Sequence, residues 1–133
     1  MRTLALQLGA IGLGAVLGAW ARWTLSLWLP AWHGVPLGTL AANLIGGYAI
    51  GVAVACFAAA PGMAPEWRLF VVTGLLGALT TFSSFSIEVI ALLERQQFAG
   101  AALAVTTHVV GSLLATALGL ATVRAVRALV GQA

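Results

Sequence analysis

The sequence contains very few charged residues. Only 7% of its 133 residues are charged, and both lysine and aspartate are absent. A typical soluble domain is about a quarter charged, whereas 62% of this chain is hydrophobic. A soluble domain of this size could not bury so much apolar surface. The composition therefore excludes a soluble globular protein and predicts an integral membrane protein that contacts the lipid bilayer.

Motifs for enzymatic, metal or nucleic-acid chemistry are also missing. The single cysteine, Cys56, lies in an apolar run, so there is no disulfide framework and no paired-cysteine metal pattern. Six scattered arginines against three glutamates give a net charge of +3 but form no basic patch for nucleic acid. P-loop, dinucleotide-binding and haem motifs are absent. Ser83, Ser84 and His108 lack the glycine pattern of a nucleophile elbow. The sequence therefore predicts neither an enzyme nor a nucleic-acid-binding protein.

The long apolar segments account for four membrane spans. At about 20 residues per span, four helices fill the chain, so we expect an all-α fold with a single transmembrane domain over residues 1–133. The first apolar run is too long for a cleaved signal peptide, and we interpret it as the first helix. His33, in the proline-bounded first loop, is expected to be exposed. The expected helices cover residues 3–29, 37–59, 67–94 and 98–126.

The arginines give a weak orientation signal. With four spans, Arg2, Arg68, Arg124 and Arg127 fall on one side of the membrane, and Arg22 and Arg95 fall on the other. Positive residues in short loops normally set the orientation, and four against two is a poor bias. A chain that inserts in both orientations would show this pattern. Two oppositely inserted copies would form an antiparallel, dual-topology homodimer, the two-chain equivalent of an inverted repeat.

Small residues predict close helix packing. Gly14 with Gly18, and Gly47 with Gly51, form GxxxG pairs in the first and second spans. Such pairs let two helix backbones approach each other in a membrane.

The third span carries the most unusual segment. Gly77 and the Thr80–Thr81 pair weaken a helix, so we expect a break near Gly77–Thr81. At membrane depth, a break is tolerated only where its backbone is buried or lines a polar cavity. Phe82 and Phe85 follow at a spacing that places both rings on one helix face. Two such rings are more often lipid-facing or core, but the break and the flanking serines favour an ion or solute site.

Other polar residues have two interpretations each. Arg22, among tryptophans, is either an interfacial anchor or part of a water-filled mouth that attracts anions. Asn43 either forms a helix–helix hydrogen bond or lines a pore, and it could do both. Glu88 is either solvated or paired with an arginine, or it serves as a gate or as the partner of Arg22 in a vestibule. His108 is expected to be a hydrogen-bonded helix histidine, because no metal-ligand partners accompany it.

From the residues alone, the chain is a small-ion pore in an inverted dimer. Hydroxyls, an amide and aromatic ring edges suit an anion, while the carbonyls of a broken helix suit a small cation. A proton-coupled antiporter is a rival, but it should carry a carboxylate in mid-membrane, and Glu88 is near a helix end. A third hypothesis is a non-transporting subunit whose GxxxG faces pack against other proteins.

Two segments resemble the signature motifs of the Fluc (CrcB-type) fluoride channel family: residues 38–46, GTLAANLIG, and residues 74–88, GLLGALTTFSSFSIE. The resemblance extends over the whole chain. It implies passive fluoride export across the bacterial inner membrane, through two pores of an antiparallel homodimer. It also implies a structural sodium ion at the dimer centre as the only cofactor.

The same resemblance implies residue roles. The residues that would line the fluoride pore are Phe82, Phe85, Asn43, Ser84, Ser112 and Thr116. Arg22 and Glu88 would lie in the vestibules. The backbone carbonyls of Gly77 and Thr80 would bind the sodium ion.

Overall fold

Four long helical spans make up most of the molecule. The computed structural model describes residues 2–32 and 34–131, so the expectation for His33 lies outside the described residues. Each span is long and apolar enough to cross a membrane. The prediction of an all-helical, four-span membrane protein is confirmed. The spans are α1 (Arg2–Trp28), α2 (Leu37–Ala59), a composite third span from Pro65 to Glu94, and α6 (Phe98–Val130).

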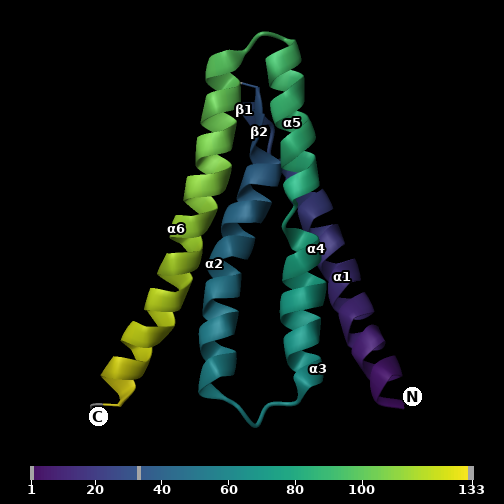
Figure 1. The fold of residues 1–133 in the computed structure, drawn as a ribbon, viewed down its shortest axis with the longest axis vertical. Helices are drawn as coiled ribbons and strands as arrows, with labels where there is room; N and C mark the ends of the chain where they lie inside the picture. Colours follow the sequence, from purple (N-terminus) through teal and green to yellow (C-terminus); the bar gives the residue numbers. More distant parts are fainter. Residues whose placement is uncertain (1, 33, 132–133) are drawn as a thin grey trace.

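The spans converge at one end of the molecule and splay apart at the other (Figure 1). The converging end carries a short hairpin of β1 (Ala31–Trp32) and β2 (Val35–Pro36), which pair antiparallel. Both termini and the connection from α2 to the third span lie at the splayed end (Figure 1). An even number of spans returns the chain to the side from which it started.

Close backbone contacts at glycine join the helices in pairs. A methyl group added at Gly18 of α1 would overlap the Leu75 carbonyl in the third span. A methyl group at Gly51 of α2 would overlap the Thr116 carbonyl in α6. Both glycines belong to predicted GxxxG pairs, and they allow α1 to pack on the third span and α2 to pack on α6.

The third span is not a continuous α-helix. It begins with α3 (Pro65–Arg68), continues as the π-helix η1 (Leu69–Leu76) and the short α4 (Gly77–Leu79), and resumes as α5 (Phe82–Glu94). The break itself is confined to Thr80 and Thr81, whose ψ angles of 153° and 123° are extended. Gly77, which we expected to take part in the break, has helical angles of −64° and −32°.

The core inside one chain is small. Eight hydrophobic residues are buried among the described residues, and they include Ala42, Leu76 and Leu79 beside the break. Large side chains such as Leu113 and Leu118 on α6 are more than 60% exposed. Surfaces of this kind need lipid or another protein chain to cover them.

Candidate functional site

One threonine hydroxyl ends the first half of the third span, and the next one begins the second half. Thr80 donates its N–H and its Oγ1 hydrogen to the Leu76 carbonyl, at 3.0 and 2.9 Å, which closes the last turn of α4. Thr81 Oγ1 accepts a hydrogen bond from the Ser84 N–H at 3.1 Å and caps the N-terminus of α5. A threonine at this position satisfies one of the amide groups that a helix start leaves without a partner.

Asn43, which lies on the neighbouring helix α2, fixes the conformation of the break through hydrogen bonds. Its Oδ1 accepts a hydrogen bond from the Thr81 N–H at 2.8 Å, and its Nδ2 donates to the Thr81 carbonyl at 3.0 Å. Nδ2 also lies 3.0 Å from Nδ1 of His108 on α6. The expected helix–helix hydrogen bond of Asn43 is therefore present, and it connects three spans.

These bonds release two backbone carbonyls. In an uninterrupted α-helix, the Thr81 N–H would bond to the Gly77 carbonyl, and the Ser84 N–H would bond to the Thr80 carbonyl. Asn43 and the Thr81 hydroxyl capture these two N–H groups instead. The carbonyls of Gly77 and Thr80 therefore lose their helical partners.

Arg22 takes a position that neither interpretation anticipated. Its Nε donates a 3.1 Å hydrogen bond to the Ala78 carbonyl, which the break also releases. The half-buried guanidinium thus lies against the C-terminus of α4, where the helix dipole is negative. Its neighbours Trp20 and Trp23 are about two-thirds exposed, as interfacial side chains would be.

Glu88 does not pair with Arg22. Its Oε1 accepts a 2.5 Å hydrogen bond from the hydroxyl of Thr39 on α2, while Arg22 bonds to Ala78. The proposed partnership between Glu88 and Arg22 is therefore wrong, because the two side chains are directed to different neighbours. Thr39 lies one helical turn before Asn43, so α2 contacts α5 through Thr39 and the cap of α5 through Asn43.

The two phenylalanines touch each other but differ in exposure. Their ring centroids are 5.4 Å apart in an edge-to-face arrangement. Phe85 is 7% exposed and stacks on the His108 ring, with centroids 4.7 Å apart, whereas Phe82 is 76% exposed. The buried ring is therefore held by α6, while the outer ring lies on the open side of the chain.

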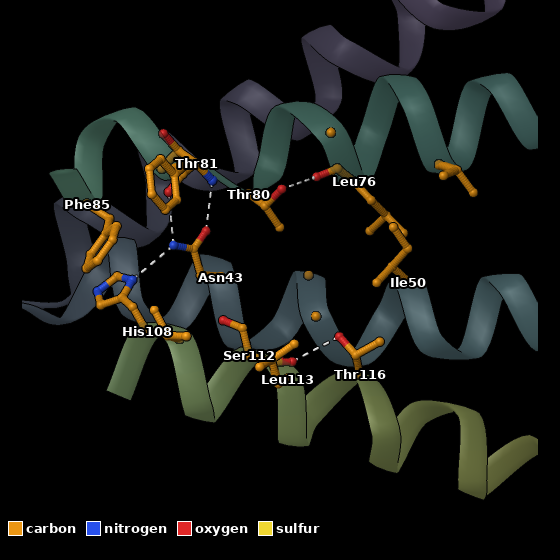
Figure 2. A pocket seen from close by; sticks show the side chains of 16 residues that line it. Asn43, Ile50, Leu76, Thr80, Thr81, Phe85, His108, Ser112, Leu113 and Thr116 are labelled. Atoms are coloured by element: carbon orange, nitrogen blue, oxygen red, sulfur yellow. Dashed lines mark hydrogen bonds between the residues drawn. The ribbon is translucent and has the colours of Figure 1, made fainter. Parts of the chain in front are cut away.

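A cavity of about 440 Å³ extends along this arrangement, between α2, the third span and α6 (Figure 2). It brings together most of the residues singled out in the sequence. Ser84 is not among the lining residues, and its hydroxyl accepts a hydrogen bond from Thr81, which does line the cavity. The predicted residues that line the cavity are Asn43, Gly77, Thr80, Phe82, Phe85, Ser112 and Thr116.

Thr81 and His108 line the cavity but were not predicted as site residues, although the expected hydrogen bond of His108 within the helices is present. Thr81 provides the cap and the backbone groups that Asn43 binds, and His108 connects Asn43 to Phe85. The spacing of four between His108 and Ser112 placed both on one face of α6. That spacing was the available signal, and a single histidine without ligand partners gave no reason to use it.

The chain is similar to a known protein family over most of its length. Residues 9–120 match the family described as "CrcB-like protein, Camphor Resistance (CrcB)". This chain belongs to the CrcB family. Within that family, it is 58% identical over 111 residues to the "Fluoride-specific ion channel FluC" of Thiobacillus denitrificans, a match covering 83% of this chain and 90% of the relative.

Two further CrcB relatives extend the comparison. The protein of the same name from Pseudomonas paraeruginosa is 60% identical over 112 residues, which cover 84% of this chain and 88% of the relative. The one from Chromohalobacter salexigens is 54% identical over 127 residues, which cover 95% and 96%. These relatives are ion channels by name, so this CrcB chain is a multi-pass bacterial membrane protein of a channel family and not an enzyme.

Proposed function

We propose that this protein is a fluoride-selective channel that lets fluoride leave the bacterial cytoplasm passively and so protects the cell from fluoride. The observation that carries the proposal is the cavity at the helix break. It combines hydroxyl groups of Ser112 and Thr116 with the rings of Phe82 and Phe85. Relatives that share more than half of their aligned residues with this chain bear the name of such a channel.

The lining of the cavity suits an anion. Its sixteen residues include no aspartate or glutamate, so no fixed negative side chain repels an anion there. Phe82, the first residue of the 13-residue helix α5, is part of the lining, and the N-terminus of a helix carries partial positive charge. The edge of an aromatic ring also carries partial positive charge. The Thr116 hydroxyl donates its hydrogen to the Ser112 carbonyl at 2.9 Å. The Ser112 hydroxyl and the ring edges would therefore together replace part of the ion's hydration shell.

A second copy of the chain, inserted in the opposite orientation, would complete the pathway. Phe82 lines the cavity and yet is 76% exposed in one chain, so one wall of the cavity is open. In an antiparallel homodimer, each copy would cover the open side of the other copy's cavity. The dimer would therefore contain two pores. The weak arginine bias permits the required dual topology.

A structural sodium ion at the centre of the dimer fits the released carbonyls. Hard cations prefer oxygen ligands, and the break frees the carbonyls of Gly77 and Thr80. Gly77 also has room, because the nearest atom to an added methyl group would be the Val72 carbonyl oxygen at 3.5 Å. These residues would hold the ion, which would supply positive charge to join the two broken helices.

Fluoride and chloride efflux from liposomes that contain the purified protein tests the function. We expect rapid fluoride release with little chloride release, and its loss in the Phe82→Ile/Phe85→Ile double variant. Phe98→Ile is the matched control, because Phe98 is exposed at the start of α6 and outside the cavity. Fluoride release no faster than from empty liposomes would refute the channel. Release that needs a proton gradient and disappears in Glu88→Gln would indicate an antiporter.

Cysteine labelling tests the dual topology. In a Cys56→Ser background, Gly62→Cys places one thiol in the loop after α2, where an added side chain meets no atom within 4 Å. We expect a membrane-impermeant thiol reagent to modify about half of the protein in intact cells. Labelling of nearly all or nearly none of the protein would contradict insertion in both orientations.

A further inference from the structure

The helix α6 is longer than a bilayer requires. Its 33 residues extend over about 50 Å, whereas the hydrocarbon core of a bilayer is about 30 Å thick. Residues 98–123 contain no arginine, lysine, aspartate or glutamate, and Arg124 and Arg127 follow them. A charged side chain is costly inside the hydrocarbon core. The apolar part of α6 therefore ends at Val123, and the last two turns would lie at the depth of the lipid headgroups.

The end of α6 is not held by the rest of the described chain. The Tyr48 hydroxyl on α2 donates a hydrogen bond to the Thr122 hydroxyl on α6 at 3.3 Å. After Thr122, no described residue of α6 forms a hydrogen bond or an ion pair with another helix. This part of α6 also stands apart from the other spans at the splayed end of the molecule (Figure 1). Its surroundings are therefore set by the membrane rather than by its own chain.

Basic and apolar side chains lie on opposite sides of this helix end. In an α-helix, Arg124 and Arg127 lie about 60° apart around the axis, and Val126 and Leu129 lie at least about 100° from either arginine. All four side chains are exposed. A helical segment with this distribution lies in the membrane interface, where its apolar side faces the acyl chains and its basic side faces the headgroups.

No glutamate neutralises these two arginines. Neither of them forms an ion pair with a described residue. The three glutamates of the chain lie elsewhere: one at the start of the third span and two on α5. The other exposed arginines differ in this respect, because Arg68 lies two residues after Glu66 and Arg95 directly follows Glu94. The end of α6 is thus a positive patch that needs an anionic partner from outside the chain.

We propose that Arg124 and Arg127 bind the phosphate group of an anionic phospholipid, while Val126 and Leu129 contact its acyl chains. Guanidinium groups match phosphate oxygens with paired, charge-assisted hydrogen bonds. The bound lipid would fix the depth of α6 in the bilayer. This inference goes beyond the proposed function, and in the proposed antiparallel dimer the two copies would present the site to opposite leaflets.

The helix dipole offers a competing explanation for the same arginines. The C-terminus of α6 carries partial negative charge, which nearby cations stabilise. If the arginines served only the dipole, their effect would not depend on the lipid headgroup. The experiment therefore compares an anionic and a zwitterionic lipid with identical acyl chains.

Native mass spectrometry of the purified full-length protein measures lipid binding directly. The protein is titrated in detergent with phosphatidylglycerol and, separately, with phosphatidylcholine. We expect tighter binding of phosphatidylglycerol, and we expect Arg124→Gln/Arg127→Gln to weaken it at least about tenfold, to the level of phosphatidylcholine. Arg68→Gln/Arg95→Gln is the matched control, because it also lowers the formal net charge of +3 by two. This control should retain most of the affinity.

Spin labels measure the position of the helix end independently of lipid affinity. In a Cys56→Ser background, a nitroxide is attached at Val126→Cys or at Ala128→Cys in vesicles that contain both lipids. Ala128 is exposed and lies on the side of Arg124. We expect the label at residue 126 to be more accessible to oxygen, as in the acyl region. The label at residue 128 should be more accessible to a water-soluble nickel complex.

Several outcomes would overturn the lipid site. Equal affinities for the two lipids would leave the arginines to the helix dipole, and equal losses in the two double variants would show an effect of net charge only. Binding of inorganic phosphate without a preference for phosphatidylglycerol would indicate a site for free anions. Two labels accessible mainly to the nickel complex would place the end of α6 in water. None of these measurements depends on ion conduction, so their failure would leave the proposed channel intact.

Discussion

Removal of the Asn43 amide should destabilise the break more than any other single polar substitution in the protein. Asn43→Ala deletes three hydrogen bonds, two to the backbone of Thr81 and one to His108. Hydrogen bonds inside membrane proteins contribute about 0.6 kcal/mol on average and about 1.7 kcal/mol at most. Three such bonds give an expected loss of about 2–5 kcal/mol in the free energy of unfolding. The upper part of this range applies if the Thr81 groups find no water.

The measurement is reversible unfolding in lipid–detergent bicelles, followed by circular dichroism. Tyr48→Phe provides a control, because it deletes one exposed hydrogen bond of 3.3 Å to Thr122, away from the break. We expect a change within about 0.5 kcal/mol for this variant. A double variant of Asn43→Ala and His108→Leu should lose less than the sum of the two single losses, since both remove the same contact.

An Asn43→Ala loss below about 1 kcal/mol would refute this reasoning. In that case the extended conformation of Thr80 and Thr81 would be held by the surrounding helices, and Asn43 would be free to contact an ion directly. Additive effects of Asn43→Ala and His108→Leu would contradict the bond between the two side chains.

Two further predictions concern the packing of α1. Gly18→Ala should cost about 1–3 kcal/mol in the same unfolding assay, because its methyl group would overlap the Leu75 carbonyl, whereas Gly12→Ala, which meets no atom within 4 Å, should be neutral or stabilising by up to about 1 kcal/mol. Equal effects of the two substitutions would contradict the close approach of α1. Arg22→Met should cost about 1–2 kcal/mol through loss of the hydrogen bond to the Ala78 carbonyl, and Arg22→Lys should recover less than half, because lysine lacks the planar group. Full recovery with lysine would show that charge alone matters at this position.

The sequence was sufficient for the features that depend on local chemistry. Hydropathy over about 20 residues is set by the side chains themselves, so the four spans could be predicted. Gly77 and the Thr80–Thr81 pair predicted a break because their weak helix propensity is intrinsic. The structure confines the break to the two threonines, since Gly77 can adopt helical angles and packs within α4.

Features that depend on helix rotation could not be predicted. Arg22 bonds to Ala78, 56 residues away, because the glycine contacts of α1 fix how the helix is turned against the third span. The same applies to Glu88, whose partner proved to be Thr39 and not Arg22. The π-helix from Leu69 to Leu76 had no signal in composition, because its apolar residues are equally compatible with an α-helix.

Under the proposed function, the backbone groups that the break leaves without helical partners would let one segment serve ions of both signs. Thr81 is satisfied by Asn43, and the Ala78 carbonyl is satisfied by Arg22. The carbonyls of Gly77 and Thr80 lose their helical partners at the negative end of α4, whereas the N-terminus of α5, which follows directly, presents N–H groups and partial positive charge. Carbonyl oxygens attract a cation, and an N–H group attracts an anion. Asn43 captures the N–H that would bond to the Gly77 carbonyl, and the Thr81 hydroxyl captures the N–H that would bond to the Thr80 carbonyl. Both side chains would therefore create the proposed cation site, and because Asn43 also lines the cavity, its replacement should disturb both proposed sites.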